Sequence, residues 1–126
     1  MNQDFASDEK LYRAVYPKSV ASMFWKNDGT ISSAAFADKK GLSVDRGNYR
    51  KDEEVVADIR KRLVGSIVSV TVGQCMDVDA EVLYLPSKNN PYHSEIHGDN
   101  ETVLLSKHQR RYLAINAKLE YSECSG

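Results

Sequence analysis

The chain has 126 residues, of which 41% are hydrophobic and 28% are charged, and its formal net charge is -1. This length and composition are typical of one compact globular domain and exclude a disordered chain. Because the net charge is near zero, the protein as a whole has no positive electrostatic potential that would attract nucleic acid or an anionic membrane. Binding to nucleic acid would therefore need a local basic patch.

Two further absences narrow the class of protein. No apolar run approaches the roughly 18 residues of a membrane span, and the first ten residues lack the basic and apolar regions of a secretory signal. The two cysteines, Cys75 and Cys124, are too few for a disulfide framework and lack metal-site spacing. We therefore expect a cytoplasmic protein with ordinary thiols, no cofactor and no membrane contact.

The chain begins with a polar, acidic stretch over residues 1–9, which predicts a flexible lead-in. Residues 10–16 then alternate as a strand does, so that Leu11, Arg13 and Val15 share one face. Arg13 thus lies between two aliphatic residues. Either its stem packs while its head reaches water, or its guanidinium is held in a cleft to bind a carboxylate or phosphate.

Residues 18–25 predict about two turns of helix that bury Val20, Met23 and Phe24. The single tryptophan, Trp25, precedes an Asn-Asp-Gly turn signal. Its indole is either a plug in the core or the wall of a pocket.

Residues 32–36 (SSAAF) are mostly small and permit a close approach of the backbone to another segment or to a ligand. The hydroxyls of Ser32 and Ser33 either bond the local backbone or bind a phosphate and position a substrate. No nucleophile elbow and no glycine-rich phosphate loop is present. Residues 42–44 predict a short strand, and Asp45 follows it at a turn.

Residues 51–64 predict the clearest helix, with Val55, Ile59 and Leu63 on one apolar stripe and Gly65 as the stop. Acidic residues fill its first turn and basic residues its last, which matches the helix dipole. These charges have a structural explanation, so we assign them no function.

Strands are predicted over residues 66–75, 81–85 and 92–97, and a Gly-Asp-Asn turn predicts a hairpin from the last of these into 101–105. The pair Asp77 and Asp79 lacks calcium-loop spacing and is interpreted as a solvated turn.

His93, Glu95 and His97 project from one face of their predicted strand. Two imidazoles and a carboxylate are ligands for a first-row transition metal, although no fourth ligand is identified. The alternatives are a solvent-facing polar surface, or an acid/base or anion-binding role for His93 without a metal.

The last predicted helix covers residues 106–121, with Ser106 as N-cap and Tyr112, Ile115 and Leu119 as its buried edge. Basic side chains crowd its first turns, against the helix dipole, and with the free N–H groups they indicate an anion site. The alternative explanation is simple solvation or pairing with acidic residues elsewhere. These basic residues are Lys107, His108, Arg110 and Arg111.

Together these elements predict a single α+β domain over residues 10–122, followed by a tail over 123–126. The domain has a mostly antiparallel sheet of five or six strands, two main helices and a short early helix.

Four phrases of the chain resemble a family of small uncharacterised prokaryotic proteins, in which they recur in the same order. They are LYR at 11–13, SSAAF at 32–36, LSVD at 42–45 and NPYH at 90–93. This resemblance spans most of residues 11–98 and implies no activity.

A weaker resemblance is to the ADP-ribosyltransferase-like fold, including the RES-type toxins, which open with an arginine-bearing strand followed by a serine-bearing segment. It implies that Arg13 clamps a dinucleotide phosphate and that Ser32 or Ser33 supports the ribose. Glu95 is the only placed candidate for the late catalytic glutamate of that fold.

Two function classes follow. The first is a binding or accessory module, of a prokaryotic defence or toxin–antitoxin system, that engages a protein partner or a phosphate-bearing ligand. The second is a small enzyme acting on a nucleotide or RNA phosphate, with His93 as general acid or base and Arg13 stabilising charge. The enzyme requires Arg13, Ser33, Asp45 and His93 to meet in one cleft.

Overall fold

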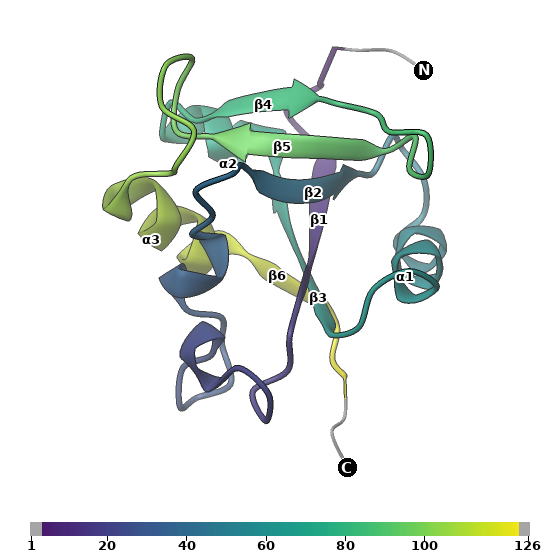
Figure 1. The fold of residues 1–126 in the computed structure, drawn as a ribbon, viewed down its shortest axis with the longest axis vertical. Coiled ribbons are helices and arrows are strands. Elements are labelled where there is room, and N and C mark those ends of the chain that lie inside the picture. Colours follow the sequence, from purple (N-terminus) through teal and green to yellow (C-terminus); the bar gives the residue numbers. More distant parts are fainter. Residues whose placement is uncertain (1–3, 124–126) are drawn as a thin grey trace.

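The computed structural model describes residues 4–123, which form a six-stranded antiparallel sheet with helices on both of its faces (Figure 1). This arrangement confirms the predicted α+β domain with an antiparallel sheet. Across the sheet the strand order is β4-β5-β2-β1-β3-β6. The strands are β1 (Lys10–Val15), β2 (Leu42–Arg46), β3 (Ser66–Thr71), β4 (Glu81–Tyr84), β5 (His93–His97) and β6 (Lys118–Tyr121). The α-helices are α1 (Asp52–Arg60), α2 (Val72–Asp77) and α3 (Lys107–Asn116), and the 3-10 helices are η1 (Ser22–Phe24) and η2 (Ser33–Phe36).

The sheet separates two hydrophobic cores. The larger core packs one face, where Leu11 and Val15, contributed by β1, lie with Phe36 of η2 and Leu113 of α3. On the opposite face a smaller core joins the sheet to α1, and Figure 1 places α1 and α3 on opposite sides. The buried members of the smaller core are Tyr12, Val55, Ile59 and Ile67.

The sheet opens between β1 and β2. These two strands pair at only two positions, Leu11 with Arg46 and Tyr12 with Asp45. By contrast, β1 pairs with β3 along its whole length, and β2 pairs with β5 from Leu42 to Asp45. Beyond Tyr12 the edge of β2 that faces β1 therefore needs other hydrogen-bond partners, and the candidate site lies at this opening.

Two of the predicted helices are wrong in extent. Residues 18–25 form only the single turn η1, and Val20 and Met23 are 70% and 69% exposed. The chain turns back at once, since the Ser32 amide donates to the Phe24 carbonyl. The helix predicted over 51–64 ends at Arg60, so Leu63 is not part of its buried stripe.

The C-terminal half contains three more corrections. The strand predicted over 66–75 ends at Thr71, whose hydroxyl and the Gln74 side chain form a capping box that starts α2. The predicted strand 101–105 does not form, because the Asp99 carboxylate accepts the amides of Glu101 and Thr102 in a turn. The last helix ends at Asn116, since β6 follows and supplies ladder partners to β3. Ile115 and Leu119 are therefore exposed rather than buried.

The residues that precede β1 are part of the fold, contrary to the predicted lead-in. Glu9 is 3% exposed and pairs with Arg46, with 2.8 Å between Oε2 and Nε. The guanidinium of Arg46 also lies over the rings of Phe5 and Tyr84, with 4.2 and 4.8 Å to the centroids. This buried ion pair ties the start of the chain to the end of β2. Residues 1–3 of the predicted lead-in lie outside the described residues.

The structure also bears on the predictions about membrane spans and cysteines. No helix in the described part of the chain combines the length and apolar character needed to cross a membrane. Cys75 is buried, and burial raises the pKa of its thiol to about 12, which makes it a poor nucleophile at neutral pH. Cys124 and most of the predicted tail lie outside the described residues.

Candidate functional site

A cavity of about 330 Å³ lies between β1, β2 and the end of α1. Three of the residues predicted as site residues line it, namely Arg13, Asp45 and His93. The rest of its wall is partly apolar and partly polar. The further lining residues are Tyr12, Ala14, Ser43, Val44, Ile59, Arg62, Leu63 and Asn90.

Arg13 bridges the opening of the sheet. Its Nε donates to the carbonyl of Ala35 at 2.9 Å, and its Nη1 donates to the carbonyl of Ser43 at 2.9 Å. Burial lowers the pKa of this guanidinium, and the nearby Asp38 charge partly opposes that change. Arg13 forms no ion pair with a carboxylate among residues 4–123, and no hydrogen bond there uses its Nη2. A half-buried cation without a paired carboxylate is unusual, because burial of a charge is costly unless it is compensated.

Strand alternation puts Arg13 on one face of the sheet and His93 on the other. Arg13 pairs opposite Val68 in the larger core, whereas His93 pairs opposite Asp45 on the face covered by α1. Because β1 and β2 separate beyond Tyr12, residues from both faces border one cavity. The opening of the sheet thus brings together side chains that a continuous ladder would separate.

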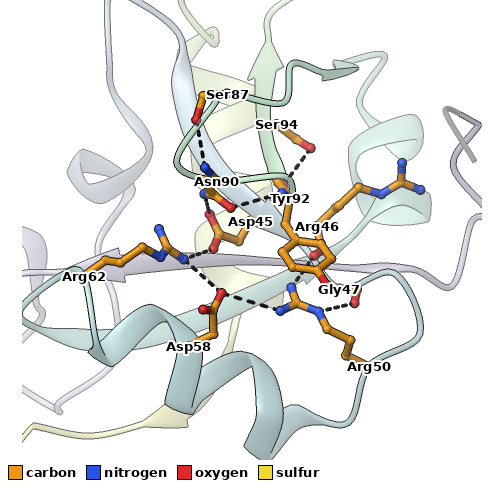
Figure 2. A network of polar contacts seen from close by, with 10 residues as sticks. All are labelled: Asp45, Arg46, Gly47, Arg50, Asp58, Arg62, Ser87, Asn90, Tyr92 and Ser94. Atoms are coloured by element: carbon orange, nitrogen blue, oxygen red, sulfur yellow. Dashed lines mark hydrogen bonds and ion pairs between the residues drawn. The ribbon is translucent and has the colours of Figure 1, made fainter. Parts of the chain in front are cut away.

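Asp45 is the centre of a polar network (Figure 2). It is 6% exposed, and its Oδ1 accepts from the Asn90 side chain at 2.9 Å while its Oδ2 pairs with Arg62 at 2.5 Å. Both carboxylate oxygens therefore have partners, and Asp45 fixes the positions of Asn90 and Arg62. The role of Asp45 at the cavity is therefore to hold Asn90 and Arg62 in place.

The network continues away from the cavity. Arg62 also reaches the Asp58 carboxylate at 3.3 Å, and Arg50 lies 3.6 Å from the same carboxylate. The Arg50 guanidinium stacks 3.4 Å from the centroid of the Tyr92 ring (Figure 2). Arg62 thus pairs with two carboxylates that compensate its charge. Arg13 has no such ion pair among residues 4–123.

His93 is held between two neighbours. Its Nδ1 lies 2.9 Å from the carbonyl of Leu85, and its Nε2 lies 3.3 Å from the hydroxyl of Ser43. A carbonyl only accepts, so the neutral imidazole carries its proton on Nδ1 and presents the Nε2 lone pair to Ser43. Ser43 itself is exposed.

The other residues predicted to bind a ligand lie elsewhere. The Ser32 hydroxyl donates to the Met23 carbonyl at 2.6 Å, and Ser33 starts η2; neither lines the cavity. The one cleft that the enzyme hypothesis requires therefore includes Arg13, Asp45 and His93 but not Ser33.

The basic start of α3 is also separate from the cavity. Ser106 and Gln109 form a capping box, so the protein itself binds one of the free amides there. The hollow beside this helix start has Asp79 and Asp99 in its wall. Of the four predicted basic residues only His108 lines it. An acidic wall is unfavourable for an anion.

The predicted metal ligands do not converge. His93 turns toward Leu85 and Ser43, whereas Glu95 and His97 bond each other at 2.8 Å. Within residues 4–123 no three His, Cys, Asp or Glu side chains are grouped so that they could hold a metal ion. Gly41 packs against the Glu95–His97 pair so closely that a Cβ atom there would lie 2.2 Å from Glu95 Oε1.

A second hollow, of about 410 Å³, lies between the turn that follows Trp25, the end of α3 and β6. Trp25 forms part of its wall, and its indole N–H donates to the Tyr16 carbonyl at 2.8 Å. Trp25 is half-buried and also packs against the larger core, so its position agrees with both interpretations. Its apolar lining includes Ile31, Val68 and Leu119.

The chain matches no known family model, no curated protein and no solved structure. The resemblances to a prokaryotic family and to the ADP-ribosyltransferase-like fold therefore stay predictions. Only the geometry of the cavity bears on function.

Among the lining residues that the sequence does not predict as site residues, three carry polar groups that contact Asp45 or His93: Ser43, Arg62 and Asn90. Ser43 is two residues before Asp45, so strand alternation already places both on one face. Arg62 was assigned to the dipole of a longer helix, but it lies beyond the end of α1 and turns back to Asp45. Asn90 had no signal apart from its place in the NPYH phrase.

Proposed function

We propose that the protein is a binding module that holds a phosphate-bearing ligand in the cavity bordered by Arg13, Ser43 and His93. The observation that carries this proposal is the charge of Arg13. Arg13 lines the cavity, and its guanidinium has two carbonyl partners and forms no ion pair with a carboxylate among residues 4–123. Planar guanidinium groups with unused donors are the preferred partners of phosphate oxygens.

The energetics of Arg13 favour an anionic ligand over a neutral one. Burial lowers the pKa of Arg13, which means that the surroundings disfavour its charged form. Asp38 offsets part of this effect from a distance, and a bound phosphate would add a directly paired negative charge and an acceptor for Nη2. Its attraction to the guanidinium is stronger here than in bulk water, because the effective dielectric constant is lower.

The position of Asp45 sets where the phosphate would lie. A second negative charge beside this carboxylate is unfavourable, although Arg62 and Asn90 offset part of that repulsion. The favourable end of the cavity is therefore the one bordered by Arg13, Ser43 and His93. There the hydroxyl and the imidazole add hydrogen-bonding groups to the guanidinium.

The size of the cavity limits the ligand. Ligand pockets usually enclose about 300–1,000 Å³, and this cavity, at about 330 Å³, is at the lower end of that range. It fits one phosphate with a small attached group better than a whole dinucleotide. The dinucleotide implied by the ADP-ribosyltransferase-like resemblance is for that reason not the ligand proposed here.

Replacing Arg13 with glutamine is expected to weaken binding of inorganic phosphate and of a nucleoside monophosphate at least about tenfold. A hydrogen bond to a charged group contributes about 1.5–3 kcal/mol, and about 1.4 kcal/mol is a factor of ten in affinity. Isothermal titration calorimetry of the full chain measures the change. Arg13→Lys keeps the charge but loses the planar fork, so we expect an intermediate affinity.

The matched control is Arg111→Gln. It removes one exposed arginine at the start of α3, the other place where the sequence indicates an anion site. Phosphate affinity should not change in this variant. Unchanged affinity in Arg13→Gln, or an equal loss in Arg111→Gln, contradicts the proposal.

A further inference from the structure

We propose that Ser43 is a nucleophile that takes the phosphoryl group of the bound ligand, with His93 as its general base. This inference rests on the proposed function, since it concerns the same cavity and the same phosphate. The observation behind it is the contact between the Ser43 hydroxyl and His93 Nε2, which are 3.3 Å apart.

The three groups have the order expected of an activated serine. A nucleophile beside a base, with the base oriented by a third group, is the common arrangement in nucleophilic catalysis. Here the Leu85 carbonyl accepts from His93 Nδ1 at 2.9 Å, which holds the imidazole in the tautomer that can accept the Ser43 proton at Nε2. The third group is a backbone carbonyl rather than a carboxylate, because both oxygens of Asp45 have other partners.

The position of Ser43 suits attack on a ligand in the cavity. Its side chain is exposed, whereas its strand is held by the pairing of Ser43 with Glu95 in β5. Arg13 donates from Nη1 to the backbone carbonyl of Ser43 itself, which fixes a guanidinium at the backbone of the proposed nucleophile. A fixed positive charge next to the reacting phosphorus stabilises the charge that develops on the transferred oxygens.

The reaction proceeds in two balanced steps. In the first, Ser43 Oγ bonds to phosphorus as its proton passes to His93 Nε2, the phosphorus–oxygen bond of the leaving group breaks, and His93 returns that proton to the leaving oxygen. In the second step, water attacks the phosphorus of the phosphoserine and one water proton passes to His93 Nε2. The bond from phosphorus to Ser43 Oγ then breaks, and His93 returns the proton to the serine oxygen. Inorganic phosphate and an alcohol are the products, and no metal or redox partner enters.

The test is covalent labelling with diisopropyl fluorophosphate, in which serine oxygen replaces fluoride at phosphorus. We expect one diisopropylphosphoryl group per folded chain, located on Ser43 by peptide mass mapping. Ser43→Ala should not be labelled, and the labelling rate should fall on the order of 100-fold in His93→Gln, as expected for loss of a general base. The matched control is His97→Gln, a histidine on the same face of β5 whose contact is with Glu95, and its rate should not change.

Folding is checked for each variant by circular dichroism, and His93→Asn is a second variant with the same expectation if His93→Gln does not fold. No label on Ser43 in the folded wild-type chain overturns the inference, as does an unchanged rate when His93 is replaced. The probe carries no charge, so labelling does not depend on the anion site. If phosphate binds but Ser43 is not labelled, the claim that Ser43 is a nucleophile is wrong and the proposed ligand stands. If Ser43 is labelled but phosphate does not bind, the proposed ligand is wrong, and the phosphoryl reaction is wrong with it.

Discussion

Replacement of Arg46 by methionine is expected to lower the free energy of unfolding by about 3–5 kcal/mol, the usual cost of breaking a buried ion pair by removing one partner. Arg46 and Glu9 have side chains that are each 1% exposed, and two of the guanidinium nitrogens lie 2.8 Å from the carboxylate oxygens. The variant leaves the Glu9 carboxylate buried without its cation. It also removes the stacking on the rings of Phe5 and Tyr84.

Urea denaturation of the full chain measures this loss. The double variant Glu9→Met with Arg46→Met should recover much of it, because no uncompensated charge then remains buried. The control is Arg60→Met, which removes an exposed arginine that stacks on Tyr121 at 4.2 Å and should cost less than about 1 kcal/mol. A loss below about 1 kcal/mol in Arg46→Met would show that the ion pair does not hold the N-terminal segment.

Asp45→Asn is expected to change stability and anion binding in opposite directions. The carboxylate accepts from Asn90 and pairs with Arg62, and both Asp45 and Asn90 are at most 9% exposed. Asparagine loses the ion pair and presents an amide where one acceptor oxygen was, so the fold should lose about 1–3 kcal/mol. The same change removes the negative charge nearest the proposed phosphate and releases the charge of Arg62, so phosphate should bind several-fold more tightly.

Two measurements on one protein sample check this prediction: urea denaturation for stability and calorimetry for phosphate affinity. Asp58→Asn is the matched control, since Asp58 also contacts Arg62 but does not line the cavity. It should change both quantities less than Asp45→Asn does. Weaker phosphate binding in a folded Asp45→Asn protein would mean that Asp45 itself contacts the ligand as an acceptor.

Local patterns were sufficient for much of the fold. The alternation along β1 predicted that Leu11 and Val15 share one face, and both lie in the larger core. The repeat of Val55 and Ile59 predicted the buried side of α1. These features depend on residues within one element. Where a distant partner decides the conformation, prediction from local pattern failed: residues 118–121 continue a helical pattern, yet they form β6 because β3 offers a free edge.

In the candidate site, too, local features were predicted and features that depend on distant partners were not. Arg13, Asp45 and His93 were predicted from their residue types, and they do line one cavity. The pairing of β2 with β5 is what brings Ser43 to His93, and these residues are separated by 50 positions in the chain. A hairpin between residues 92–97 and 101–105 was predicted in its place. Arg62 was missed because a basic residue near a helix end already has a sufficient local explanation.

The most direct test of the central claim is a titration of ¹⁵N-labelled protein with inorganic phosphate, followed by two-dimensional NMR. Phosphate in the cavity should shift the Nε–H signal of Arg13 and the amide signals of Ser43 and His93, with smaller changes elsewhere. All three groups border the proposed phosphate position. If the largest shifts instead fall on Lys107, Arg110 and Arg111, or if phosphate shifts no signal of the cavity, the claim that Arg13 forms an anion site is wrong.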